Sequence, residues 1–95
     1  MKSGIYMIQN IVTGDRYIGS SRNLKHRRAS HFSEMKNGDH GNYKIRRDCK
    51  KYGVEVFKWF VVEIVEDVDR LVEREQFWLD TSKPEYNVMK TAQNH

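Results

Sequence analysis

Five polar side chains stand where the sequence pattern otherwise favours packing, and together they suit phosphodiester hydrolysis. They are Tyr6, Tyr17, Arg27, His31 and Glu75. A carboxylate can hold a hard divalent cation such as Mg²⁺, which polarises a phosphate and stabilises the leaving oxygen. An arginine offsets charge that grows on phosphoryl oxygens. A tyrosine, with an ordinary pKa of about 10, activates water only if nearby positive charge lowers that pKa.

Motifs for other chemistries are absent from the sequence. No GxxxxGKS/T, GxGxxG, HExxH or GxSxG pattern occurs, so nucleotide-binding, zinc-protease and serine-hydrolase interpretations lack support. The histidines do not have the spacing of a structural zinc site; they are His26, His31, His40 and His95. Cys49 is the single cysteine, so it forms no internal disulfide, fits a reducing cytoplasm and is expected to fill the core.

A predicted β-hairpin places the two tyrosines. Residues 4–8 and 16–19 are rich in β-forming side chains, and a Thr-Gly-Asp sequence between them has turn chemistry. A two-residue Thr-Gly loop would set Asn10 opposite Tyr17. Any loop of even length puts Tyr6 and Tyr17 on the same sheet face, because side chains alternate along a strand.

A first helix is predicted after an N-cap at Ser21 or Asn23. Its apolar stripe contains Arg27 and His31, which are neighbours at positions i and i+4. A glycine-containing loop at residues 37–41 ends this helix.

A second helix is predicted over about residues 42–52, with Gly53 after its last turn. Basic side chains surround its apolar seam, and three of them form one stripe that suits phosphate contacts with DNA: Lys44, Arg47 and Lys51. The alternative is a basic face that is merely solvated.

Residues 54–65 alternate as a strand, and both faces of that strand are largely apolar. A strand covered on both faces is typical of the centre of a sheet, so we expect residues 54–65 to form the central strand. After Pro84, residues 85–88 are expected to be a short extended segment.

A third helix is predicted after an N-cap at Asp67 or Asp69, and Glu75 lies in the middle of its apolar face. A buried carboxylate costs several kcal/mol unless a cation, a metal or good hydrogen-bond donors compensate for its lost hydration. A structural ion pair with Arg27 is the alternative to a metal site.

Length and charge limit the class of protein. Ninety-five residues suit one domain over residues 1–95, and no uninterrupted apolar run, such as residues 59–62, is nearly long enough for a membrane helix. No export signal is recognisable, so we expect a cytoplasmic protein with no membrane association. The net charge is +4, but residues 1–53 carry +8 and the rest −4, which favours a polyanionic partner.

The sequence resembles the GIY-YIG nuclease family, and most closely the catalytic domains of phage intron-encoded, homing-type endonucleases. Gly4-Ile5-Tyr6 and Tyr17-Ile18-Gly19 are the two tripeptides that name the family, ten residues apart. The family's other site residues match five positions downstream, within a resemblance that spans about residues 3–90: Arg27, His31, His40, Glu75 and Asn87.

The resemblance implies an α/β fold, a small three-stranded antiparallel sheet flanked by helices in the order β-β-α-α-β-α. It also implies a divalent-metal-dependent DNA endonuclease that cuts one strand per catalytic centre and needs no small-molecule cofactor. Glu75 would be the sole protein ligand of Mg²⁺, with Mn²⁺ as the alternative metal, and Arg27 would stabilise the transition state. We favour Tyr6 as the residue that activates water, supported by a hydrogen bond from Tyr17.

Two other functions stay open at this point. The first is a noncatalytic nucleic-acid-binding module, in which Glu75 would only repel a phosphate. The second is a repair or restriction nuclease of the same superfamily, which differs in its attached domains. Homing-type relatives carry a separate DNA-recognition domain, and we expect none after Ala92, so the chain is either an excised catalytic domain or acts alone.

Overall fold

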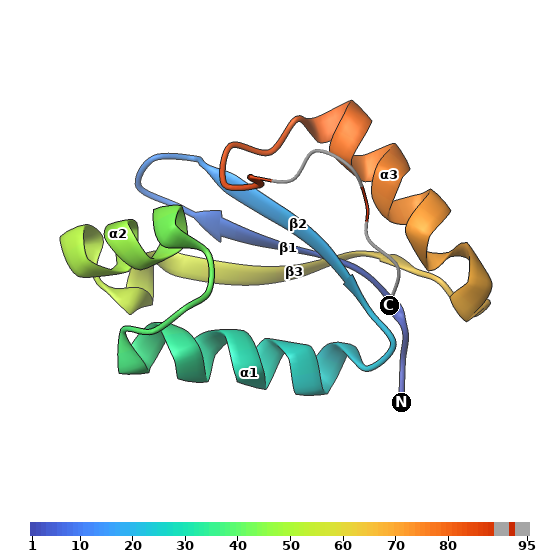
Figure 1. Cartoon of the computed structure of the whole chain (residues 1–95), viewed down its shortest axis with the longest axis horizontal. Coiled ribbons are helices and arrows are strands. Elements are labelled where there is room, and N and C mark those ends of the chain that lie inside the picture. Colours follow the sequence, from blue (N-terminus) through green and yellow to red (C-terminus); the bar gives the residue numbers. More distant parts are fainter. Residues whose placement is uncertain (89–91, 93–95) are drawn as a thin grey trace.

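The computed structural model describes residues 1–88 and 92, so His95 lies outside the described residues. It contains a three-stranded antiparallel sheet in the order β2-β1-β3, flanked by helices, and the predicted fold is confirmed (Figure 1). The elements are β1 (Gly4–Asn10), β2 (Arg16–Ser21), α1 (Leu24–Asn37), α2 (Tyr43–Tyr52), β3 (Phe57–Ile64) and α3 (Leu71–Ser82). Single turns of 3₁₀ helix, Val54–Val56 and Val68–Arg70, precede β3 and α3.

The hairpin keeps the predicted faces but not the predicted register. Ile8 pairs with Tyr17 and Tyr6 with Gly19, so the predicted pairing of Asn10 with Tyr17 is wrong. The turn is longer than two residues because the Asn10 side chain accepts hydrogen bonds from the main-chain N–H groups of Val12 and Thr13, which holds a wider loop. Since the longer loop is still even in length, Tyr6 and Tyr17 share a sheet face as predicted.

The predicted central position of residues 54–65 is wrong, because β1 is central and β3 is an edge strand. Three apolar residues of β3 remain nearly half exposed: Phe60 at 42%, Val61 at 46% and Ile64 at 45%. The segment after α3 occupies the outer edge of β2, where the Tyr86 N–H donates to the Arg16 carbonyl, so no further strand pairs there within the described residues. An apolar sequence on both faces therefore does not mark the centre of this sheet.

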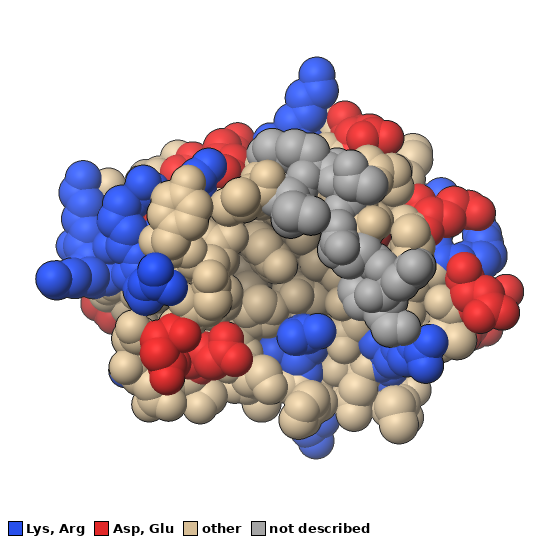
Figure 2. Space-filling view, viewed as in Figure 1, with Lys and Arg blue, Asp and Glu red and all other residues tan. Residues whose placement is uncertain are grey.

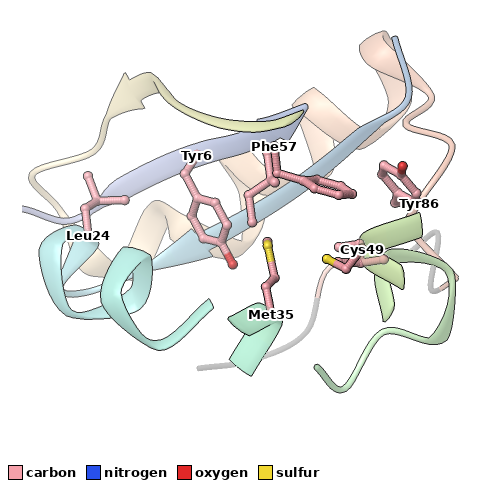
Figure 3. Close-up of a cluster of buried hydrophobic side chains, with 8 residues drawn as sticks. Tyr6, Leu24, Met35, Cys49, Phe57 and Tyr86 are labelled. Carbon is pink, nitrogen blue, oxygen red and sulfur yellow. The ribbon is translucent and has the colours of Figure 1, made fainter. Parts of the chain in front are cut away.

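The sheet separates two hydrophobic clusters. On one face, Tyr6 and Ile8 pack with α1 and α2, and Cys49 fills this core as predicted (Figure 3). On the other face, Ile5 and Ile18 pack with α3. None of the helices in the described part of the chain is long and apolar enough to cross a membrane.

The predicted helix ends are largely confirmed. Asn23 caps α1, Asn42 caps α2 and Asp67 caps the 3₁₀ turn before α3, each by accepting main-chain N–H groups. Gly53 follows α2 with a φ of 92°, which only glycine adopts without strain. The segment 85–88 forms a turn and not the predicted extended strand, because it must bend along the edge of β2.

Glycine in each tripeptide leaves room for a neighbouring group. A Cβ at Gly19 would fall on the ring and hydroxyl group of Tyr6, and a Cβ at Gly4 would fall on the main-chain oxygen of Glu63. The two glycines therefore permit close packing across β1, and Gly19 in particular leaves the space that the Tyr6 hydroxyl occupies.

Gly19→Ala should destabilise the fold by about 1–3 kcal/mol, because the added methyl group overpacks the site of the Tyr6 ring. Gly41→Ala is the matched control, since nothing lies within 4 Å of a Cβ at that position, and its stability should stay within about 0.5 kcal/mol of the parent. Urea unfolding of the three proteins measures both effects. Equal stabilities of the two variants would contradict this packing explanation.

Candidate active site

A cleft of about 490 Å³ opens beside the outer edge of β2. Five predicted site residues line it, from five different segments of the chain: Tyr17, His31, His40, Glu75 and Asn87. Tyr6 lies behind this cleft in the core, and Arg27 is exposed on α1. The fold thus brings together most residues that the sequence singled out.

A chain of hydrogen bonds crosses the wall of the cleft. The Tyr6 hydroxyl lies 2.6 Å from Nε2 of His31, and Nδ1 of His31 lies 2.7 Å from Nε2 of His40. The main-chain N–H of Asn42 donates to Nδ1 of His40 over 3.0 Å. His31 and His40 are buried, and their rings stack with centroids 4.9 Å apart.

The direction of these hydrogen bonds follows from the Asn42 N–H at one end, because a main-chain N–H can only donate. His40 must therefore accept at Nδ1, so neutral His40 carries its proton on Nε2 and donates to His31. His31 then accepts at Nδ1 and donates from Nε2 to the Tyr6 hydroxyl. The proton of Tyr6 is left to point towards Tyr17.

The pKa shifts agree with neutral rings. Burial lowers the pKa of His31 to about 3, with further lowering from His40 and Arg27. Burial also lowers the pKa of His40. Burial raises the pKa of Tyr6 well above its ordinary value, and the neighbouring Tyr17 acts in the same direction.

The two tyrosines differ in their access to the cleft. Tyr6 is 2% exposed, and burial raises its pKa well above 10. Tyr17 is partly exposed and lines the cleft; its pKa is also raised, by burial and by Glu75, while Arg27 lowers it. Tyr17 is therefore the tyrosine that a water molecule in the cleft can reach.

Glu75 reaches the cleft from the buried face of α3, where Leu71 and Leu79 flank it one turn away on each side. It is 9% exposed and accepts a hydrogen bond from the Ser20 hydroxyl group. The alternative of a buried ion pair with Arg27 is not realised, since Arg27 takes part in no ion pair within the described residues.

The donor set fits a metal ion that keeps most of its waters. No group of three or more His, Cys, Asp or Glu side chains is placed to hold a metal among residues 1–88 and 92. Both ring nitrogens of His31 and of His40 already take part in hydrogen bonds, and of the two carboxylates that line the cleft, Glu75 is buried and Glu34 is exposed. Mg²⁺ is commonly held by one or two carboxylates while it retains several waters.

Asn87 holds the edge of β2. Its Oδ1 accepts from the Ile18 N–H and its Nδ2 donates to the Ile18 carbonyl, both over 2.8 Å. The side chain thus imitates a neighbouring strand at Ile18, which lies between Tyr17 and Gly19 of the second tripeptide. Asn87 lines the cleft, but its polar atoms serve to position the strand that carries Tyr17 and Gly19.

The basic stripe on α2 is less free than predicted. Lys44 donates to the main-chain carbonyl of Glu85, and Arg47 forms an ion pair with Asp48 at 2.8 Å. Lys51 is exposed beside the Tyr52 ring, and Lys and Arg side chains cover the α2 end of the face in Figure 2. Two of the three cations therefore have partners within the chain that would compete with a phosphate.

Two residues that contribute to the site carry no signal as site residues in the sequence. Ser20 follows the second tripeptide on the opposite sheet face from Tyr17, which points it at Glu75. Asn42 stands at the predicted start of the second helix, and its N–H fixes the tautomer of His40 only because the loop folds back onto α1. Neither contact follows from spacing along the chain.

The fold and the cleft are those of a GIY-YIG catalytic domain. Residues 2–87 match the model of that domain, and the chain belongs to this family.

Among its relatives is the intron-associated endonuclease 1 of Enterobacteria phage T4, 38% identical over 80 residues, which cover 83% of this chain and 32% of that protein. The chain thus spans about a third of the length of this curated relative. The structure is similar to the catalytic domain of the intron endonuclease I-TevI, solved as an E75A mutant, with a TM-score of 0.85, 31% identity and coverage of 99% of this chain and 100% of that chain. A second structure of the catalytic domain of homing endonuclease I-TevI has a TM-score of 0.82, 32% identity and coverage of 93% of this chain and 99% of that chain.

The lowered pKa of His31 should make stability depend on pH. Its neutral form is favoured in the folded state, so stability is complete above the ordinary pKa of 6.5 and falls as the pH drops towards about 3. By about pH 4.5 the loss should amount to roughly 1–3 kcal/mol. Urea unfolding across this range should show a shallower decline for His31→Gln than for the control His26→Gln, whose ring is exposed.

Nitrogen NMR of the folded parent protein provides an independent check. His31 should remain the neutral Nε2–H tautomer well below pH 6.5. A His31 ring that titrates near its ordinary pKa would contradict the directed hydrogen-bond chain.

Proposed function

We propose that the domain is a divalent-metal-dependent DNA endonuclease that hydrolyses phosphodiester bonds, one strand per catalytic centre. The observation that carries the proposal is that one cleft joins a buried carboxylate, Glu75, to an accessible tyrosine, Tyr17. Membership of a catalytic-domain family and relatives named as endonucleases support nuclease chemistry. Because a single Glu75 and a single Tyr17 serve the cleft, one strand is cut at a time.

Glu75 is the proposed ligand of Mg²⁺ or Mn²⁺. Ser20 fixes the rotamer of the carboxylate by donating to Oε1, and burial among leucines limits its movement. When bound, the metal would supply a Lewis acid that polarises the phosphate and stabilises the leaving oxygen. Without a cation, a carboxylate at this position would repel a phosphate.

Tyr17 is the proposed residue that orients and deprotonates the attacking water. Burial and Glu75 raise its pKa, and the charge of Arg27 and the hydrogen bond with Tyr6 offset part of that rise. This proposal replaces the sequence-based preference for Tyr6, whose hydroxyl is buried and already hydrogen-bonded to His31. Tyr6, His31 and His40 then act as positioning residues.

Arg27 is the proposed stabiliser of the transition state. Its side chain is exposed and lies close enough to lower the pKa of Tyr17, while no ion pair within the described residues engages its guanidinium group. A planar guanidinium can donate to two phosphoryl oxygens at once. The noncatalytic alternative lacks a reason for a buried carboxylate in the same cleft.

Glu75→Gln should abolish cleavage and keep the fold, because the amide retains the shape but loses the charge that holds the metal. We expect nicking of supercoiled plasmid in Mg²⁺ to fall by on the order of 10²-fold or more. Glu73→Gln is the matched control, since Glu73 lies on α3 but is exposed and paired with Arg70. Parental nicking by Glu75→Gln would remove the metal role.

The two tyrosines should separate in a paired experiment. Tyr17→Phe should reduce single-turnover cleavage by on the order of 10²-fold. Tyr6→Phe should cost about 1–2 kcal/mol of stability, because the Nε2–H of His31 loses its acceptor, and should reduce cleavage less. If Tyr6→Phe impaired cleavage more than Tyr17→Phe, the assignment of Tyr17 would be wrong.

A further inference from the structure

A second concave surface lies on the opposite side of α1 from the active-site cleft, between α1 and the edge strand β3. We call it the α1–β3 groove, and its main lining residues are Lys25, Arg28, Phe32, Lys36, Lys58 and Trp59. It consists of two adjoining hollows of about 780 and 520 Å³ that share Lys25, Arg28 and Trp59. At 100° per residue, its α1 side chains lie about 150° around the helix from Arg27, His31 and Glu34.

The rim of the groove carries cations without local partners. Its lining includes Lys25, Arg28, Lys36 and Lys58, and Lys2 at one end, but no Asp or Glu. None of these five takes part in an ion pair within residues 1–88 and 92, whereas each of the arginines Arg16, Arg47, Arg70 and Arg74 does. Such a surface is complementary to an extended anion.

The floor of the groove is aromatic, and Trp59 is its centre. One ring face of Trp59 stacks on Tyr6, with centroids 4.5 Å apart and an interplanar angle of 12°. Trp59 is only half-buried and lines both hollows, so it also presents surface to the groove. A further planar ring can continue the stack of Tyr6 and Trp59.

We propose that the α1–β3 groove binds a segment of single-stranded DNA, with a base stacked on Trp59 and phosphates on the α1 cations. The choice of DNA rests on the proposed function. Positively charged grooves with aromatic stacking platforms are the usual construction of single-strand sites, and stacking needs unpaired bases that a duplex keeps internal. Lys25 to Lys36 spans about 16 Å along the helix, which is enough for a few nucleotides of extended strand.

The test follows the fluorescence of Trp59 in the full chain. Trp78→Phe leaves Trp59 as the single tryptophan, and Trp78 lies on α3, where its indole N–H donates to Glu63. A short oligothymidylate, added in EDTA, should quench this fluorescence. An abasic strand of equal length should bind more weakly and quench less, because it offers phosphates but no base.

Charge removal distinguishes the groove from other basic surfaces. In the same background, replacing Lys25, Arg28 and Lys36 by Gln should lower the magnitude of the salt slope of log K by about 2, since each single-strand phosphate contact contributes about 0.7. Affinity at about 0.1 M salt should fall by on the order of 10- to 100-fold. The control replaces Lys50, Arg70 and Lys83 by Gln, and its binding should stay close to the parent.

Three outcomes would overturn the proposal: no quenching by oligothymidylate, equal quenching by the abasic strand, or unchanged binding in the groove variant. Quenching that depends on protein concentration alone would instead indicate a second copy on the exposed edge of β3. Because binding is measured without metal, these outcomes are separate from failure of the proposed nuclease activity. That failure would appear as absence of plasmid nicking by the parent chain in Mg²⁺ or Mn²⁺.

Discussion

The requirement that buried polar groups find hydrogen-bond partners is the constraint on which the rest of this small domain depends. It acts most clearly between Asn42 and Tyr6, where two buried imidazoles join a helix N-terminus to the central strand. Each donor in this chain has one acceptor, so the first N–H determines the position of every later proton. The conformation of the loop that carries His40 and Asn42 therefore sets the direction of the hydrogen bonds as far as Tyr6, whose own proton points towards Tyr17.

The same constraint shapes the edge of the sheet. The segment after α3 supplies strand-like hydrogen bonds to β2 through the Asn87 side chain and the Tyr86 main chain. The Tyr86 hydroxyl donates to buried Asp48 of α2 and accepts from Asn10 at the hairpin turn, so three distant segments are tied together. The cleft lies beside this junction, and hydrogen bonds between Asn87 and Ile18 hold together the part of its wall that contains Tyr17 and Asn87.

The active-site cleft and the α1–β3 groove use opposite sides of one helix, and the aromatic stack of Tyr6 and Trp59 connects them through the core. The cleft pairs a carboxylate with neutral imidazoles, which suits a metal and a reacting phosphate. The groove has cations and no carboxylate, which suits an anion that does not react. This division of charge distinguishes the two surfaces that we propose for nucleic acid.

The family is recognisable from the two tripeptides in the sequence. The order of elements, the shared face of Tyr6 and Tyr17 and the burial of Glu75 are also predictable from it, because alternation, helical period and capping residues are local patterns. The sequence did not determine that β3 lies at the edge, since both faces of that strand are apolar whichever neighbours it has. It also favoured Tyr6 for chemistry. Only the tertiary structure decided that Tyr17 faces the cleft and that Ser20 supports Glu75, because burial and hydrogen-bond direction depend on contacts between residues far apart in the chain.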